Sequence, residues 1–252
     1  MPLLEARTLS KRYDSGALAV DNVSFSIERG ETLGLVGESG SGKSTIARMV
    51  LGLIEPTSGS VVFDGQRITG VPQRRLRSTR RRMQVVFQDP FAALNPRMRV
   101  RDIVAEPLVI HRACPRSDLT SRISELLRAV GLDNSMLARY PHEFSGGQRQ
   151  RINIARALAL KPEMIVLDEP VSALDVSVGA QIINLLRDLQ RDFSLTYLFI
   201  SHSMPLVRYL ATNIAVLCRG RLVESGPSLE ICDAPREAYT RALLAATPEI
   251  RL

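Results

Sequence analysis

The 252-residue sequence predicts an α/β fold in which a parallel sheet carries an inserted helical lobe. The continuous apolar runs at 164–167 and 197–200 are typical of parallel strands that are covered on both faces. Between them, apolar residues recur at helical spacing over 182–189, and the order strand, helix, strand indicates a right-handed parallel unit. A longer helical stretch, from about 97 to 140, lies between two parts of this core and is therefore expected to form the lobe.

The first third of the chain predicts strands around one helix. Short apolar runs bounded by turn residues indicate strands at 3–9, 20–27, 32–36, 61–63 and 85–87. Over 46–54 apolar residues recur on more than one helical face, as expected of a buried helix that ends at Pro56-Thr57-Ser58-Gly59. Near the other end of the chain, residues 213–226 predict a hairpin that turns at Arg219-Gly220.

The basic excess of the chain is concentrated in one segment. The sequence has 33 Lys and Arg against 26 Asp and Glu, a net charge of +7. Six arginines lie between residues 74 and 82, and without them the balance is 27 against 26, or +1. We favour a solvated helix face there, with contact to nucleic acid or anionic lipid as the alternative. No aromatic residue interleaves with the run to stack on bases, which speaks against nucleic acid.

Composition favours a globular protein of the cytosol. Apolar residues make up 45% and charged residues 23%. The sequence has no run near the roughly 18 apolar residues of a membrane span, and its first residues lack the features of a signal peptide. The three cysteines, Cys114, Cys218 and Cys232, form no C-x-x-C pair, so we expect free thiols rather than a disulfide or a zinc site.

A glycine-rich loop follows the predicted strand at 32–36. Its sequence is Gly37-Glu38-Ser39-Gly40-Ser41-Gly42-Lys43-Ser44-Thr45. Glycines let backbone N–H groups wrap anionic phosphates, and the next helix adds its positive N-terminal end. Lys43 is expected to reach the β and γ phosphates, and the Ser44 hydroxyl to bind Mg²⁺. Because a strand and a helix flank the motif as required, the sequence predicts a nucleotide-binding P-loop.

Two further motifs fit phosphate chemistry. Asp168 and Glu169 follow the apolar run at 164–167, at the carboxyl end of a predicted parallel strand, where ligands bind in open α/β sheets. Asp168 suits Mg²⁺ and Glu169 suits polarising the attacking water. The segment 145–148 opens a predicted helix with a serine and two glycines. On its own it indicates either a second anion site at a helix N-terminus or a simple N-cap followed by a turn.

The P-loop and Phe144-Ser145-Gly146-Gly147-Gln148 together resemble the motifs of the ATP-binding-cassette (ABC) ATPases, with Phe144 in place of the commoner leucine. The resemblance extends through nearly the whole chain. It implies one ABC ATPase domain over 1–252, with a P-loop NTPase core, an N-terminal antiparallel β subdomain and an inserted α-helical lobe. The implied parts are the core at 1–90 and 160–235, the lobe with the signature motif at about 91–159, and a short C-terminal element at 236–252.

The same resemblance implies roles for single residues. Tyr13 is similar to the aromatic residue that stacks on adenine, Gln88 to the glutamine that joins Mg²⁺ to the membrane domain, and His202 to the histidine that holds the γ-phosphate. The implied catalytic residues are Glu169, His202, Gln88 and Lys43. The implied Mg²⁺ ligands are Ser44, Gln88 and Asp168. Contacts to the ATP of a partner subunit are implied for Ser145, Gly146, Gly147, Gln148 and Asp175.

Two segments are similar to one branch of the family, the peptide and nickel importers. They are residues 88–98 and 239–244. The chain departs from that branch at Glu237-Ala238, where His-Pro usually precedes Tyr-Thr, and at Ser203, where an aspartate usually follows the switch histidine.

The resemblance implies an ATP-hydrolysing subunit that energises import of peptides, nickel or metallophores, or related small solutes. Its implied partners are a second ATPase subunit, two membrane permease subunits and, indirectly, an extracytoplasmic solute-binding protein, without nucleic acid. We favour a non-identical sister as the second ATPase subunit, with a homodimer as the alternative. The chain would then lie on the cytoplasmic face of the inner membrane. We expect the segment between Gln88 and Tyr140 to dock on the permease, with Phe91 and Leu94 as contacts.

Three other functions stay open on the sequence. An ABC ATPase of a soluble, non-transport complex is the main alternative. A P-loop kinase is disfavoured by the motif at 144–148, and a non-hydrolysing ATP-binding module is disfavoured by Glu169 and His202.

Overall fold

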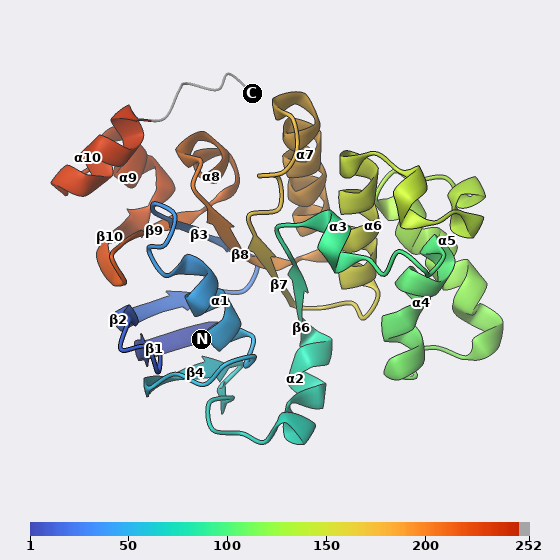
Figure 1. Ribbon diagram of the computed structural model, residues 1–252, viewed down its shortest axis with the longest axis horizontal. Coiled ribbons are helices and arrows are strands. Elements are labelled where there is room, and N and C mark those ends of the chain that lie inside the picture. Colours follow the sequence, from blue (N-terminus) through green and yellow to red (C-terminus); the bar gives the residue numbers. More distant parts are fainter. Residues whose placement is uncertain (247–252) are drawn as a thin grey trace.

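Two sheets organise the chain in the computed structural model, which describes residues 1–246 (Figure 1). The smaller sheet has the order β2-β1-β4-β5, and its paired strands are antiparallel. Its strands are β1 (Leu4–Arg12), β2 (Leu18–Ile27), β4 (Ser58–Phe63) and β5 (Gln66–Arg67). The expected N-terminal antiparallel β subdomain is therefore confirmed.

The larger sheet has the order β10-β9-β3-β8-β7-β6. Its strands are β3 (Thr32–Val36), β6 (Met83–Val86), β7 (Met164–Asp168), β8 (Thr196–Ser201), β9 (Asn213–Cys218) and β10 (Arg221–Pro227). All neighbours pair in parallel except β9 and β10, which form the expected hairpin. Arg219 and Gly220 both have positive φ in its two-residue turn, as hairpin turns of this length require.

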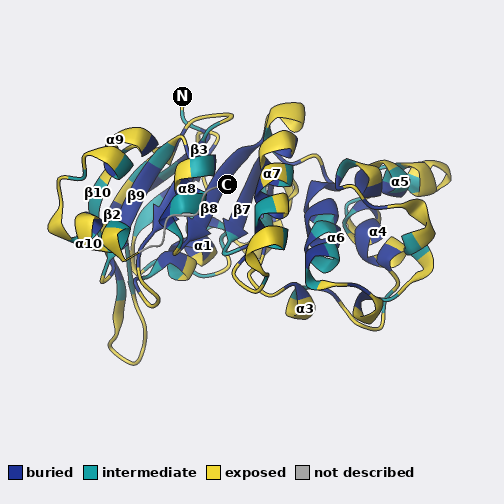
Figure 2. Ribbon diagram, turned by 90° about the horizontal axis from the view of Figure 1, so that it is seen from above, coloured by how far each residue is buried: buried dark blue, intermediate teal, exposed yellow. Residues whose placement is uncertain are grey.

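The central strands of the larger sheet, β3, β7 and β8, are buried on both faces (Figure 2). In β7, Met164 and Val166 join the core that is shared with the antiparallel sheet, whereas Ile165 and Leu167 join the core of the opposite face. Strand β8 repeats this alternation. Both strands therefore read as unbroken apolar runs, because each of their two faces is covered.

Helices cover the two faces of this sheet. Helix α1 (Lys43–Val50) shares one core with β3 and the antiparallel sheet. Helices α7 (Val176–Phe193) and α8 (Met204–Leu210) pack on the opposite face. The chain continues into α9 (Ser228–Asp233) and α10 (Ala238–Ala245). The last six residues of the expected C-terminal element, 247–252, lie outside the described residues.

The segment between β6 and β7 forms a group of helices to one side of the sheet (Figure 1). Its α-helices are α3 (Pro90–Ala93), α4 (Val100–Ile110), α5 (Leu119–Ala129) and α6 (Gly146–Leu158). Single 3₁₀ turns lie at η2 (Arg116–Asp118), η3 (Asn134–Ala138) and η4 (Pro141–Glu143). The stretch from 97 to 140 is thus not one helix, because the chain turns at 111–118 and again after 130. The exact boundaries of this lobe remain a prediction.

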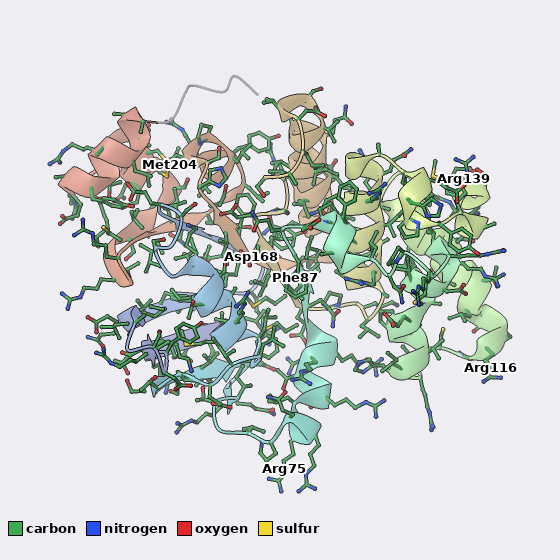
Figure 3. All side chains as sticks on the ribbon, viewed as in Figure 1. Arg75, Phe87, Arg116, Arg139, Asp168 and Met204 are labelled. Atoms are coloured by element: carbon green, nitrogen blue, oxygen red, sulfur yellow. The ribbon has the colours of Figure 1, made fainter. Side chains whose placement is uncertain are left out.

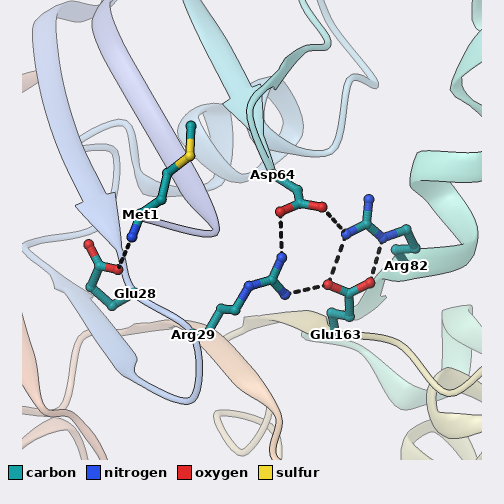
Figure 4. A network of polar contacts seen from close by, with 6 residues as sticks. All are labelled: Met1, Glu28, Arg29, Asp64, Arg82 and Glu163. Atoms are coloured by element: carbon teal, nitrogen blue, oxygen red, sulfur yellow. Dashed lines mark hydrogen bonds and ion pairs between the residues drawn. The ribbon is translucent and has the colours of Figure 1, made fainter.

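The arginine-rich segment forms η1 (Gln73–Leu76) and α2 (Arg77–Arg82). The expectation of a solvated face is wrong for Arg82, whose guanidinium joins Asp64 and Glu163 in an ionic network that also includes Arg29 (Figure 4). The network joins turns of the antiparallel sheet to the segment that leads into β7. Hydrogen bonds from Arg82 are the main cause that lowers the pKa of both carboxyl groups. This part of the run is therefore structural.

Candidate functional site

The glycine-rich loop joins the carboxyl end of β3 to the start of α1, as predicted. Gly42 precedes the helix with a φ of 108°, and a Cβ there would lie 2.4 Å from the carbonyl oxygen of Ala19. Gly37 is equally constrained, because a Cβ would lie 2.1 Å from the carbonyl oxygen of Leu217. Only glycine fits these two positions, since any side chain would meet backbone atoms that cannot move away.

Lys43 is the first residue of α1 and its side chain is buried. Its ammonium donates hydrogen bonds to the carbonyl oxygens of Gly37 (2.7 Å) and Glu38 (2.8 Å). Burial lowers the pKa of this ammonium, and the carboxylates of Glu169 and Asp168 oppose that shift. A buried cation inside a loop of backbone amides is suited to bind polyphosphate.

Ser44 and Asp168 face one another across the site. The Ser44 hydroxyl donates to Asp168 Oδ1 at 3.2 Å. Burial raises the pKa of Asp168, and the bond from Ser44 partly offsets this. A hydroxyl and a partly buried carboxylate are oxygen ligands of the kind that Mg²⁺ prefers. Within residues 1–246 there is no group of three or more His, Cys, Asp or Glu that could hold a metal ion.

Glu169 lies at the centre of the predicted catalytic group. Its Oε2 accepts a hydrogen bond from Gln88 Nε2 at 3.2 Å and contacts His202 Nδ1 at 3.2 Å. Gln88 follows β6, Glu169 follows β7 and His202 follows β8, which are neighbouring parallel strands. Their carboxyl ends therefore meet at one edge of the sheet, where such folds bind ligands. The structure brings together three residues that are dispersed in the sequence.

These groups surround a cleft of about 290 Å³. It is lined by Ala19, Ser39, Gly40, Gly42, Lys43, Ser44, Thr45, Gln88 and Glu169. Ala19, in β2, was not predicted, because a small apolar residue carries no chemical signal in a sequence. Tyr13 lies beside the cleft, with its hydroxyl 3.4 Å from Thr45 Oγ1, and is partly exposed. Figure 3 shows Asp168 at the centre of the molecule, near Phe87.

The motif at 144–148 does not line this cleft. Ser145 caps α6: its hydroxyl accepts from the Gln148 N–H while its own N–H donates to the Gln148 side chain. A Cβ on Gly147 would lie 2.4 Å from Val178, so the start of α6 packs closely on the start of α7. Asp175 caps α7 through the Val178 N–H at 2.9 Å. Among the described residues, none of 144–148 lines the P-loop cleft of the same chain.

Two of the departures from the family pattern, Phe144 and Ser203, keep local structural roles. Phe144 is buried in the core of the lobe, so the larger ring replaces leucine without becoming exposed. Ser203 precedes α8, and its N–H donates to Ser201 Oγ at 3.0 Å. His202 still reaches Glu169 beside this serine.

Comparison with known proteins decides the family. A family model described as ABC transporter matches residues 20–172. The chain belongs to the ABC transporter family. Relatives of this ABC ATPase include a putative peptide import ATP-binding protein of Brucella ovis, which is 52% identical over 98% of this chain and 79% of its own length. The oligopeptide transport ATP-binding protein OppF of Bacillus subtilis is 53% identical over 98% of this chain and 82% of its own length.

Solved structures agree with the fold. The structure of cbiO1 from Clostridium perfringens, described as part of the ABC transporter complex cbiONQ, matches with a TM-score of 0.83. Its identity is 27%, and the match covers 91% of this chain and 90% of that chain. The cassette MJ0796, in a dimeric post-hydrolysis state bound to ADP and Pi, matches with a TM-score of 0.81 and 30% identity over 89% of this chain and 98% of its own. The ABC ATPase fold and an ATPase activity follow. In the described part of the chain, no helix combines the length and apolar character needed to cross a membrane.

Proposed function

We propose that this ABC ATPase hydrolyses ATP to energise an importer of peptides or related small solutes, with nickel or metallophores as further candidates. The convergence of Gln88, Glu169 and His202 beside the P-loop is the observation that carries the ATPase step. Glu169 polarises the attacking water, Lys43 offsets charge on the β and γ phosphates, and His202 holds the γ-phosphate. Relatives named for peptide and oligopeptide import support the solute class.

Mg²⁺ fits the oxygen ligands of the site. Ser44, Asp168 and Gln88 would hold it, and the ion would supply charge neutralisation between the β and γ phosphates. Burial raises the pKa of Asp168, and a cation bound beside this carboxylate would favour its ionised form.

Two subunits close around ATP in this proposal. Ser145, Gly146, Gly147, Gln148 and Asp175 contact the nucleotide on the partner's P-loop. None of these residues lines the P-loop cleft of its own chain, and the cassette MJ0796 is dimeric; both observations support this arrangement. The partner is a non-identical sister ATPase, and the pair lies under two permease subunits on the cytoplasmic face of the inner membrane, with a solute-binding protein on the other side.

An apolar groove next to Gln88 is suited to receive a cytoplasmic segment of the permease. It has a volume of about 360 Å³ and lies where the end of α1, α2, β6 and the end of α4 meet. Leu53 and Phe87, which line it, are 49% and 40% exposed. Phe87 directly precedes Gln88, which donates a hydrogen bond to Glu169. A displacement of Phe87 by a segment bound in the groove would therefore also displace Gln88. This continuity supports the permease, rather than a soluble partner, as the occupant.

The structure corrects one expected docking contact. Leu94 is 1% exposed and belongs to the core of the lobe, so it is unavailable to a partner. Phe91 is 58% exposed, and the Arg149 guanidinium lies 3.9 Å from the centre of its ring. Phe91 therefore remains a candidate contact, and it links the segment after Gln88 to helix α6.

The substitution Phe87→Asp tests the groove. A carboxylate in an apolar docking surface leaves a buried charge unpaired, so we expect recovery of permease from solubilised membranes by the tagged chain to fall at least about tenfold. Phe193→Asp is the matched control, since Phe193 is 46% exposed at the end of α7, away from the groove. The control should recover permease as the wild type does.

Three results distinguish the alternatives. Equal recovery of permease by wild type and Phe87→Asp would place the docking surface elsewhere. Recovery of a soluble complex without permease would replace the importer by a non-transport ABC ATPase. Phosphate release by the purified chain and its sister, measured with and without Mg²⁺, tests the enzyme itself.

A further inference from the structure

The C-terminal helix α10 contacts the P-loop from outside the nucleotide cleft. The hydroxyl of Tyr239 accepts a hydrogen bond from the backbone N–H of Glu38 at 3.2 Å. The two residues are 201 positions apart in the sequence. Tyr239 is not among the residues that line the cleft, so this bond acts on the loop and not on a ligand.

The backbone of Glu38 makes hydrogen bonds through both its N–H and its carbonyl oxygen. Its N–H donates to Tyr239, while its carbonyl oxygen accepts from Lys43 Nζ at 2.8 Å. Lys43 has to direct its donors to phosphate oxygens when ATP binds, which weakens its bonds to the carbonyl oxygens of Gly37 and Glu38. The bond from Tyr239 requires no such change, because Tyr239 does not line the nucleotide cleft.

Tyr239 is itself well anchored. In the turn that leads into α10, the carboxylate of Glu224 accepts from the backbone N–H groups of Arg236 (2.7 Å) and Glu237 (3.2 Å). The next residue, Thr240, is fully buried, and the Tyr239 ring packs against the main hydrophobic core. The substituted positions Glu237-Ala238 therefore still start a helix that presents Tyr239 to the loop.

The other flank of the loop is braced as well. The N–H of Gly220, in the β9–β10 turn, donates to the carbonyl oxygen of Ser41 at 2.9 Å. Two hydrogen bonds from outside the loop therefore hold it: one from α10 at Glu38 and one from the β9–β10 hairpin at Ser41. A loop that is already held in its binding conformation loses less conformational entropy when a ligand binds.

We propose that Tyr239 is a positioning residue for ATP: its hydroxyl holds the start of the P-loop in the phosphate-binding conformation. The proposal needs only ATP binding and is independent of the transported solute. It also assigns a role to the C-terminal element, namely support of the nucleotide site.

The substitution Tyr239→Phe removes only the hydroxyl. We expect the Kd for ATPγS, measured by calorimetry on the full chain with Mg²⁺, to rise about threefold to tenfold, the effect of one lost hydrogen bond. The maximal rate of phosphate release at saturating ATP, in the assembled ATPase pair, should stay within about twofold. Tyr209→Phe is the matched control, because the Tyr209 hydroxyl bonds Asn184 (2.7 Å) and Arg187 (2.9 Å), which lie on α7. Its Kd should match the wild type.

Amide hydrogen exchange provides a second, direct measurement. The Glu38 amide should exchange faster in Tyr239→Phe than in the wild type or Tyr209→Phe, with exchange in β8 unchanged. An unaltered Kd, an unaltered Glu38 amide, or equal effects of the two substitutions would overturn the proposal. Uniform acceleration throughout the chain would also overturn it, because Tyr239 would then support folding in general. None of these results bears on recovery of permease, so the importer function is tested separately.

Discussion

Glu169 is held in a left-handed backbone conformation, with a φ of 48°, that residues other than glycine rarely adopt. Its N–H donates to the carbonyl oxygen of Ile200 at 3.0 Å, and its own carbonyl oxygen accepts from the Ser172 N–H at 3.2 Å. These bonds keep the carboxylate between Gln88 and His202. Strained backbone that neighbouring contacts maintain is typical of functional sites.

The substitution Glu169→Gln should separate binding from hydrolysis. The amide keeps the shape of the side chain but cannot act as a base, so we expect turnover to fall at least about a hundredfold while ATP affinity is retained. The closed dimer should persist, because ATP is no longer consumed. Phosphate release, ATP calorimetry and size-exclusion chromatography measure the three effects. Glu230→Gln, on the exposed surface of α9, is the control. Near-normal turnover in Glu169→Gln would contradict the assignment.

At the scale of elements, the contact between the antiparallel sheet and the parallel sheet is partly ionic. Arg82 at the end of α2 and Arg29 between β2 and β3 both bind Asp64 and Glu163, so each carboxylate has two cationic partners (Figure 4). Glu163 directly precedes β7, and its backbone N–H also donates to the Arg82 carbonyl oxygen at 2.8 Å. The network therefore fixes the position of α2 relative to the strand that ends in Asp168.

Glu163→Gln should lower the free energy of unfolding by about 1 kcal/mol near neutral pH, as expected for a partly exposed ionic network. The bonds from Arg82 are the main cause that lowers the pKa of Glu163 in the folded state. Its stabilisation is therefore fully present above the ordinary glutamate pKa of about 4.3 and is lost as pH falls through the lowered folded pKa.

Urea unfolding at a series of pH values measures this effect. The difference between wild type and Glu163→Gln should be constant from neutral pH to about pH 5 and should shrink below that. Glu125→Gln, which breaks an exposed pair with Arg122, should change stability by less than about 0.5 kcal/mol. A difference that grew on acidification would show that Glu163 does not act through its ionised form.

At the scale of the whole molecule, the two phosphate-handling motifs are separated by the architecture. The P-loop lies at the carboxyl end of β3, whereas the motif at 144–148 starts α6 against α7. Helix α6 is joined to the segment after Gln88 by Arg149, which stacks on Phe91, and by Arg156, which donates to the Ala93 carbonyl oxygen at 2.6 Å. A rotation of the lobe would therefore move the signature motif and this segment together.

The substitution Ser145→Arg should act on the partner's ATP. A large cation at the start of α6 obstructs an anion site there, so we expect hydrolysis at the sister subunit's P-loop to be abolished while the isolated chain binds ATP normally. Calorimetry on the isolated chain and phosphate release by the assembled pair test both halves. Ser135→Arg, on the exposed surface of η3, is the control. Full activity of the assembled pair, or loss of ATP binding by the isolated chain, would refute the role in trans.

The sequence by itself determined the features that depend on residues close together along the chain. The P-loop is one continuous segment whose glycines, lysine and serine act through local backbone geometry, so its residues could be named without the structure. The buried strands β7 and β8 could also be predicted from the sequence, because burial on both faces produces unbroken apolar runs. The hairpin at 213–227 followed from strand patterns on both sides of a two-residue turn.

Tertiary structure alone decided which distant groups meet. Apolar periodicity tells which face of an element is buried but not which element covers it, so the burial of Leu94 and the pairing of Arg82 with Glu163 could not be foreseen. The roles of Gln88 and His202 came from resemblance, and their shared contact with Glu169 depends on strand order in the sheet. The bond between Tyr239 and Glu38 joins segments 201 residues apart, and only the packing of α10 beside the P-loop creates it.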